Sequence, residues 1–115
     1  MTVLINNKMI ELDQFSSREF KRTISKGVSV VDFNTPWSAP CRAQERIIAD
    51  LGKAYQGRAT VATVNIDQNR ELALNLEIQS IPTIIIFKDA IEVMRFVGLQ
   101  TAETLNMAVK SILAA

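Results

Sequence analysis

The stretch that decides the fold is a run of strand-forming residues, a loop and the start of a helix: Val28-Ser29-Val30-Val31-Asp32-Phe33-Asn34-Thr35-Pro36-Trp37-Ser38-Ala39-Pro40-Cys41. Residues 28–33 are apolar and rich in β-branched side chains, which predicts a strand covered on both faces. From Ala39 to about Tyr55, apolar residues recur at helical spacing. Pro40 fits the first turn of this helix because the N–H that proline lacks would be unpaired there. The stretch therefore predicts a buried strand that leads into a helix with Cys41 near its N-terminus.

Strand and helix patterns alternate on both sides of this stretch. Strands are predicted at residues 3–5, 61–66, 83–87 and 91–97, the last two as a hairpin. Three N-caps predict helices, namely Ser16, Asn69 and Thr101. Ser16 forms a capping box with Glu19, and Phe15 and Phe20 occupy the positions of a hydrophobic staple. This first helix should end near Gly27. Strands joined through helices pair in parallel, whereas a hairpin is antiparallel. The order β-α-β-α-β-α-β-β-α predicts a single domain over residues 1–115, an α/β three-layer sandwich with a mixed sheet.

The composition limits what such a domain can bind. Of the 115 residues, 48% are hydrophobic, and 13 basic against 12 acidic side chains leave a formal charge of +1. This near-neutral charge argues against nucleic acid as a partner. Because the chain has no histidine and a single cysteine, Cys41, it forms no internal disulfide and offers no usual zinc site. We therefore expect no metal and no cofactor.

The sequence predicts a cytoplasmic monomer with no membrane association. The longest apolar run, residues 84–87, is far shorter than the roughly 18 residues that span a membrane. Asn6, Asn7 and Lys8 interrupt any signal-peptide core at the N-terminus.

Three features go beyond ordinary core and turn chemistry. The turn from Trp37 to Cys41 lies where a helix begins, and the free N–H groups of a helix N-terminus favour a thiolate or another anion. The alternative is that Trp37 is a loop aromatic, Ser38 a plain N-cap and Cys41 a small buried side chain. Pro82 fits the first residue of a strand, and nothing local shows whether its peptide bond is cis. Asp32 is a carboxylate in a buried strand, so desolvation should raise its pKa and make it a candidate functional group.

The ordered set of motifs resembles the thioredoxin family over nearly the whole chain: Val31-Asp32-Phe33, Trp37-x-x-Pro40-Cys41, Val64-Asn65-Ile66-Asp67, Ile81-Pro82-Thr83 and Val97-Gly98. The resemblance implies the thioredoxin fold, a five-stranded mixed sheet flanked by four helices, with a cis peptide bond before Pro82. It also implies a protein thiol–disulfide oxidoreductase that reduces disulfide-bearing proteins and is recharged by an NADPH-dependent thioredoxin reductase. In that role Cys41 is the resolving thiol and Asp32 its proton acceptor. The residues implied to line the groove for an extended substrate segment are Trp37, Ala39, Pro40, Ile81, Pro82 and Gly98.

The main departure from the family pattern is Ser38, which occupies the position of the attacking cysteine. Disulfide exchange requires a thiolate, and a serine hydroxyl stays protonated near neutral pH, so the chain as it stands should not turn over. Asn34 stands in place of an aromatic residue. Thr63 replaces a lysine, and the loss of that cation should leave the pKa of Asp32 higher. Arg46 replaces a proline, which predicts a straighter second helix.

Three interpretations are open. Ser38 is a cysteine-to-serine change in an otherwise active thioredoxin, or it marks a natural form that has lost dithiol chemistry. The natural form would use the groove of Trp37, Ile81 and Pro82 to bind extended peptides. In the third interpretation Cys41 acts alone as a monothiol, although the family's monothiol members keep the first cysteine and lose the second.

Overall fold

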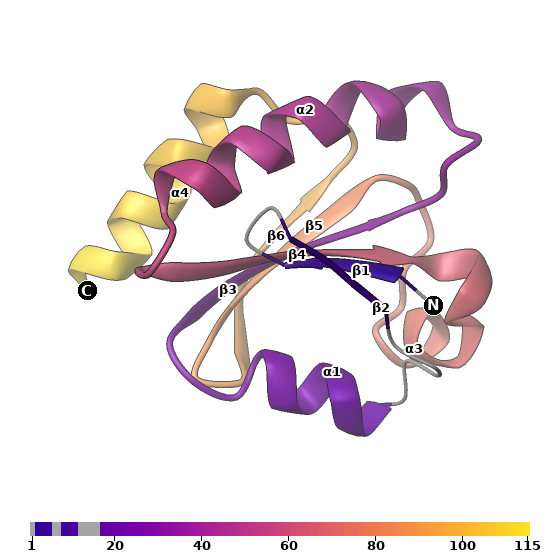
Figure 1. Cartoon of the computed structure of the whole chain (residues 1–115), viewed down its shortest axis with the longest axis horizontal. Helices are drawn as coiled ribbons and strands as arrows, with labels where there is room; N and C mark the ends of the chain where they lie inside the picture. The colour runs from indigo at the N-terminus through magenta and orange to yellow at the C-terminus, as the bar shows by residue number, and fades with distance from the viewer. Residues whose placement is uncertain (1, 6–7, 12–16) are drawn as a thin grey trace.

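The computed structural model describes residues 2–5, 8–11 and 17–115. The elements in chain order are β1 (Thr2–Ile5), β2 (Lys8–Glu11), α1 (Ser17–Thr23), β3 (Val28–Asn34), α2 (Ala39–Ala54), β4 (Ala59–Asn65), the 3-10 turn η1 (Ile66–Gln68), α3 (Arg70–Asn75), β5 (Thr83–Lys88), β6 (Ile91–Val97) and α4 (Ala102–Ala114). Within the described residues, six strands form one mixed sheet in the order β2-β1-β4-β3-β5-β6. Helices α2 and α4 cover one face and α1 and α3 the other (Figure 1). The predicted α/β three-layer sandwich is confirmed.

The N-terminal end of the sheet differs from the prediction of five strands. The strand predicted at residues 3–5 is one arm of a hairpin, in which Leu4 of β1 lies opposite Met9 of β2. Strand β1 also pairs with β4 in the antiparallel sense. Because the hairpin reverses the chain, the strand that leads into α1 is β2, and β2 runs in the same direction as β3 and β4.

Helix length explains why one helix-linked connection is parallel and another is not. Strands β3 and β4 pair in parallel through α2, as predicted. Its 16 residues span about 24 Å, close to the length of a seven-residue strand. Helix α3 has six residues and spans only about 9 Å. The chain therefore re-enters the sheet at the edge where β4 ends, and β5 is antiparallel to β3, contrary to the prediction.

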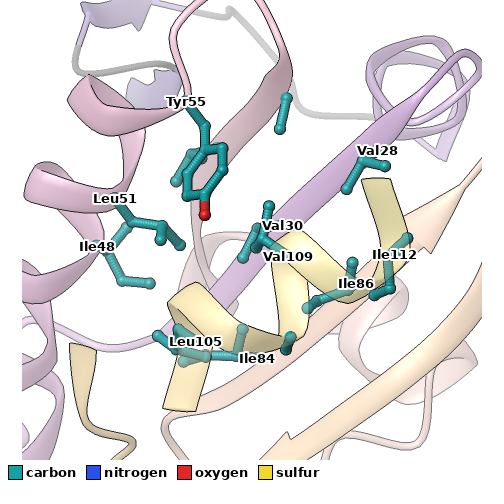
Figure 2. Close-up of a cluster of buried hydrophobic side chains, with 13 residues drawn as sticks. Val28, Val30, Ile48, Leu51, Tyr55, Ile84, Ile86, Leu105, Val109 and Ile112 are labelled. Atoms are coloured by element: carbon teal, nitrogen blue, oxygen red, sulfur yellow. The ribbon is translucent and has the colours of Figure 1, made fainter. Parts of the chain in front are cut away.

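Two apolar cores lie on opposite faces of the sheet, and successive residues of β3 alternate between them. The core under α2 and α4 is shown in Figure 2 and contains Val28, Val30, Ile48, Leu51, Tyr55, Ala59, Val61, Ile84, Ile86, Leu105, Ala108, Val109 and Ile112. The core under α1 and α3 contains Phe20, Ile24, Val31, Phe33, Ala62, Val64, Leu72, Ile85 and Phe87. By this alternation Asp32 lies on the α2 and α4 face, beyond Val28 and Val30.

The predicted helix ends are confirmed in part. Thr101 caps α4, and its Oγ1 accepts a hydrogen bond from the N–H of Thr104 at 3.1 Å. Asn69 precedes α3 as predicted but makes no side-chain capping bond, and its Nδ2 donates to the Asn65 carbonyl instead. Helix α1 ends at Thr23 rather than near Gly27, and Ser25 Oγ donates to the Arg22 carbonyl at 2.8 Å, one of the carbonyls that the helix end leaves without a partner. The predicted cap at Ser16 and the staple residue Phe15 lie outside the described residues.

Candidate functional site

The carboxyl end of β3 gathers the predicted site at one edge of the sheet. Phe33 lies opposite Thr83 of β5, which in turn lies opposite Val97 of β6. On the other side of β3, Asn34 lies opposite Asn65 of β4. The segments adjoining these strand ends therefore meet at one edge of the sheet, namely residues 35–38, 66–69, 80–82 and 98–101.

Ser38 caps helix α2 at this edge. Its backbone is extended, with φ −85° and ψ 127°, and its Oγ accepts a hydrogen bond from the Cys41 N–H at 3.4 Å. The side chain satisfies one of the N–H groups that every helix N-terminus leaves without a partner. Ala39 and Pro40 are exposed on the first turn. Ser38 is thus the N-cap of α2, as the alternative interpretation of the Trp37 to Cys41 turn predicts.

Cys41 is a free, buried thiol with 2% of its surface exposed. It lies on the inner side of α2, below the cap. The Arg42 guanidinium on the outer side donates to the Trp37 carbonyl at 3.0 Å and so holds the turn against the helix. The chain therefore has a hydroxyl at the helix N-terminus and keeps its one thiol inside.

Asp32 is fully buried one layer beneath this helix end. Its Oδ2 accepts a hydrogen bond from Asn34 Nδ2 at 3.1 Å, whereas Oδ1 has no partner within the described part of the chain. Burial raises the pKa of Asp32 to about 7, the Asn34 bond partly opposes this rise, and the nearby Glu45 charge adds to it. The pKa is raised as the sequence predicts. No hydrogen bond joins Asp32 to Cys41 among the described residues.

Asn34, a departure from the family pattern, is a polar neighbour of Asp32. Residues two apart in a strand point to the same face, so Asn34 and Asp32 are placed side by side by their spacing alone. The amide supplies the only hydrogen bond that the Asp32 carboxyl receives in the described structure. Thr63 lies opposite Asp32 in β4.

Trp37 forms an exposed wall of the site, with 68% of its surface accessible. Its indole Nε1 donates to Asp67 Oδ2 at 2.9 Å, across the 30 residues that separate them in sequence. The Asp67 N–H in turn donates to Asn65 Oδ1 at 2.9 Å. The indole is therefore held in a fixed orientation against η1, with its ring available to a ligand.

Pro82 and Gly98, which the family resemblance implies line the same groove, are joined by a hydrogen bond. The Gly98 N–H donates to the Pro82 carbonyl at 2.8 Å. The peptide bond between Ile81 and Pro82 is cis, the isomer that the family resemblance implies. Pro82 is buried and Ile81 half-buried. The loops before β5 and after β6 thus form one continuous surface at the sheet edge.

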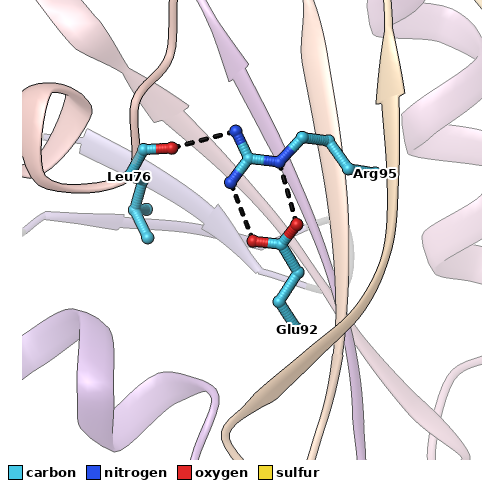
Figure 3. A network of polar contacts seen from close by, with 3 residues as sticks. All are labelled: Leu76, Glu92 and Arg95. Carbon is cyan, nitrogen blue, oxygen red and sulfur yellow. Dashed lines mark hydrogen bonds and ion pairs between the residues drawn. The ribbon is translucent and has the colours of Figure 1, made fainter.

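An ion pair on β6 supports the loop that carries Ile81 and Pro82 (Figure 3). The Arg95 guanidinium binds the Glu92 carboxylate through Nε at 2.9 Å and Nη2 at 2.7 Å, and its Nη1 donates to the Leu76 carbonyl at 2.9 Å. The pairing of β5 with β6 shifts between Ile86 and Phe87, which leaves Val93 of β6 as the extra residue of a bulge. Residues 92 and 95 would otherwise point to opposite faces. This pairing has no signal in a simple strand pattern.

Gln44 is a second residue that sequence analysis did not identify. It is fully buried on the inner side of α2. Its side-chain amide forms two hydrogen bonds with the backbone of Gln100, which lies 56 residues away in sequence. The available signal was its position three residues after Cys41 and four before Ile48, where a helix stripe directed at the core should carry an apolar residue.

Within the described ranges, no group of three or more metal-ligating side chains could hold a metal ion. The same residues include no helix long and apolar enough to cross a membrane.

The sheet, its helix layers and the edge formed by Trp37, Cys41 and Pro82 define a thioredoxin fold. The model of the thioredoxin family matches residues 11–111. A thioredoxin of Staphylococcus aureus is 36% identical over 87 residues, which is 76% of this chain and 84% of that protein. The chain belongs to the thioredoxin family.

Solved structures agree with this assignment. A mutant thioredoxin from Halobacterium salinarum NRC-1 matches with a TM-score of 0.77 and 29% identity over 87% of both chains. The thioredoxin Mala s 13 of Malassezia sympodialis shares the fold, with a TM-score of 0.75 and 23% identity over 85% of this chain and 86% of its own.

Proposed function

We propose that this chain is a thioredoxin-family thiol–disulfide oxidoreductase in a form that engages protein substrates but, with Ser38 in place of the attacking thiol, does not turn over. The observation that carries the proposal is the arrangement at the N-terminus of α2. Ser38 occupies the cap with 8% of its surface exposed, and Cys41, the only sulfur nucleophile, lies behind it with 2% exposed. A substrate disulfide that reaches the edge would meet an alcohol.

The chemistry of exchange explains why this arrangement stops turnover. A thiolate attacks one sulfur of the substrate disulfide, and the other substrate sulfur leaves as a thiolate. A second thiol then attacks the mixed disulfide, so the protein ends with an internal disulfide and the substrate with two thiols. A protonated serine hydroxyl does not start this sequence, and one cysteine cannot store the two electrons as an internal disulfide.

The remaining parts of a resolving apparatus support an oxidoreductase origin. Asp32 is buried beneath the end of the helix that carries Cys41, and its pKa of about 7 suits a group that accepts a proton near neutral pH. In this proposal Asp32 takes the proton of Cys41 when a mixed disulfide is resolved. Trp37, Ala39, Pro40, Ile81, Pro82 and Gly98 bind the substrate segment, and an NADPH-dependent thioredoxin reductase recharges the active form.

The test restores the missing thiol. The unchanged chain should reduce insulin disulfides no faster than dithiothreitol alone, whereas Ser38→Cys should accelerate the reaction and accept electrons from thioredoxin reductase and NADPH. Ser38→Cys combined with Cys41→Ser is the matched control, because it has the attacking thiol but nothing to resolve the mixed disulfide. Reduction by the unchanged chain would refute the proposal, and an inactive Ser38→Cys variant would refute the oxidoreductase origin.

A binding module without redox chemistry is the second candidate, and the exposed Trp37 indole favours it. The indole is oriented by its hydrogen bond to Asp67, so it can contact a bound segment without any redox step. The reduced and alkylated B chain of insulin, an extended peptide without free thiols, is a suitable probe. B-chain binding that persists in Cys41→Ala supports this candidate, because an alkylated peptide forms no mixed disulfide. Intact insulin is the disulfide-bearing comparison: capture of insulin that is lost in Cys41→Ala or under reductant points to mixed disulfides.

We further propose that the protein acts as a monomer in the cytoplasm. Its unpaired cysteine fits a reducing compartment. Size-exclusion chromatography with and without dithiothreitol tests the monomer, since a dimer linked through Cys41 would dissociate on reduction.

A further inference from the structure

The amide of Gln44 is matched to the backbone of a single residue in the loop between β6 and α4. Gln44 Nε2 donates to the Gln100 carbonyl at 3.0 Å, and Gln44 Oε1 accepts from the Gln100 N–H at 2.7 Å. The two bonds pair the side chain with the loop in the way that one strand pairs with another. One donor and one acceptor in fixed relation set both the distance and the orientation of the loop relative to α2.

Two more hydrogen bonds extend this contact to the cis-proline loop. Gln100 Nε2 donates to the Gly98 carbonyl at 3.2 Å, and the Gly98 N–H donates to the Pro82 carbonyl at 2.8 Å. Gly98 has a φ of 91°, a backbone conformation that residues other than glycine rarely adopt. An unbroken series of four hydrogen bonds therefore runs from α2 through the loop to Pro82.

Packing alone does not require an amide at position 44. The residues that continue the same inner stripe of α2, Ile48 and Leu51, are apolar and equally buried. A buried amide is costly unless its polar atoms are bonded, and an apolar side chain of similar volume would fill the same space without that requirement. The contribution of Gln44 is thus the position that it gives to Gln100.

We propose that Gln44 is a positioning residue for the substrate groove. It holds the loop of Gly98 and Gln100, and through them Pro82, at a fixed place relative to the N-terminus of α2, where Trp37 and Ser38 lie. This inference rests on the proposed function, since it assigns Gln44 a role in binding extended protein segments at that edge.

The first test replaces Gln44 with methionine, which has a similar length and removes both hydrogen bonds. In Gln44→Met the Gln100 and Gly98 amides should exchange with solvent about tenfold faster or more, measured by NMR. Affinity for the reduced and alkylated insulin B chain should fall about tenfold, the loss expected from one to two hydrogen bonds. Gln56→Met, at an exposed glutamine beyond the end of α2, should change neither quantity.

A matched core variant separates positioning from general stability. Val109→Ala removes buried volume from the core that α4 forms with α2 and the sheet. It should lower the unfolding free energy without changing B-chain affinity. Gln100→Ala, a partly exposed change that removes only the bond to Gly98, should weaken binding about threefold and provides the test if Gln44→Met does not fold.

The outcomes distinguish this inference from the function on which it rests. If the unchanged chain does not bind the B chain, the groove function fails and the binding role of Gln44 fails with it. Faster exchange in Gln44→Met would then still support Gln44 as the group that positions the loop. If the chain binds and Gln44→Met leaves the affinity unaltered, the inference is overturned while the groove function stands.

Discussion

Helix α2 buries one continuous stripe of side chains whose chemistry changes halfway along the helix. The first half presents Cys41 and Gln44, and the second half presents Ile48, Leu51 and, at the C-cap, Tyr55. The second half packs against α4 and the sheet in the apolar core of Figure 2. The first half faces the carboxyl edge of the sheet, where buried polar groups are concentrated.

The difference between the two halves shows where the molecule gains stability and where it loses it. Burying a large apolar side chain contributes about 1.5–3 kcal/mol, so the second half stabilises the fold. A buried polar group costs free energy unless it is bonded. At the first half, Asp32 keeps one oxygen without a partner within the described structure. The polar half is thus retained for the site, and the apolar half offsets its cost.

The largest effect expected from the polar half is the pH dependence that Asp32 gives to the unfolding free energy. Its pKa is about 7 in the folded chain against an ordinary value of 3.8. Between these values the folded state holds a proton that the unfolded state has released, so stability should fall as pH rises from about 4 to about 7. The total loss is about 4 kcal/mol and is complete above pH 7. Urea unfolding measured from pH 4.5 to 8 gives this slope.

Asp32→Asn removes the titrating group while keeping a similar shape. The variant should be more stable than the unchanged chain at pH 8 and should lose most of the slope. Asp50→Asn, at an exposed carboxylate on α2, should leave the slope intact. Parallel stability curves for Asp32→Asn and the unchanged chain would contradict a buried, titrating Asp32.

The apolar half of the stripe provides the second test. Ile48 is 1% exposed, and Ile48→Ala should cost roughly 3 kcal/mol of unfolding free energy because a cavity remains in the core. Leu74→Ala, at a side chain that is 77% exposed, should cost close to nothing. Both are measured by urea unfolding. A small loss for Ile48→Ala would mean that the second half of α2 does not stabilise the fold as the comparison requires.

Local sequence patterns predicted those parts of the fold that depend on nearby residues. The apolar run of β3, the helical spacing of α2 and the cap at Thr101 all arise within a few positions along the chain. The β1 and β2 hairpin was missed because Lys8 and Glu11 give the second strand polar ends. The consecutive residues Asn6 and Asn7, which are common turn formers, were considered only as an interruption of a signal-peptide core.

The site was predictable to the extent that its parts are close in sequence. Asp32, Ser38 and Cys41 follow from one short stretch, and Asn34 could have been paired with Asp32 by strand spacing. The bonds of Gln44 to Gln100 and of Trp37 to Asp67 join residues that are 56 and 30 positions apart. Such contacts exist only once the sheet has placed the strand ends together, and no local pattern specifies them.

Ser38 lies at the top of the stripe, as the N-cap of α2. Ser38→Ala removes the side-chain oxygen that caps α2 and should cost about 1 kcal/mol of unfolding free energy. Thr101→Ala removes the corresponding cap of α4 and should cost about the same, which makes it the matched control. Urea midpoints of the two variants at pH 7 give the comparison. A stabilising Ser38→Ala would show that the hydroxyl does not cap the helix.

The smallest expected loss of unfolding free energy comes from the exposed ion pair of Glu92 and Arg95. The Glu92 and Arg95 side chains are 37% and 28% exposed, and Arg95 lowers the pKa of Glu92 mainly through their hydrogen bonds. The pair therefore stabilises the fold above the ordinary pKa of glutamate, and this contribution is lost as pH falls through the lowered value. Glu92→Gln should cost only about 0.5 kcal/mol at pH 7, because solvent screens an exposed pair. Most of the destabilisation by Glu92→Gln should disappear in 1 M NaCl, because salt screens the ion pair in the unchanged chain.

The control for Glu92→Gln is Asp50→Asn, which removes the more exposed pair of Asp50 with Arg46 and should have a still smaller effect. Arg95 also donates to the Leu76 carbonyl, so amide exchange in the following loop reports whether the ion pair orients that segment. A salt-independent loss of 2 kcal/mol or more in Glu92→Gln would place this pair with the buried polar groups of the first half of α2. Polar burial would then no longer be concentrated at the site edge.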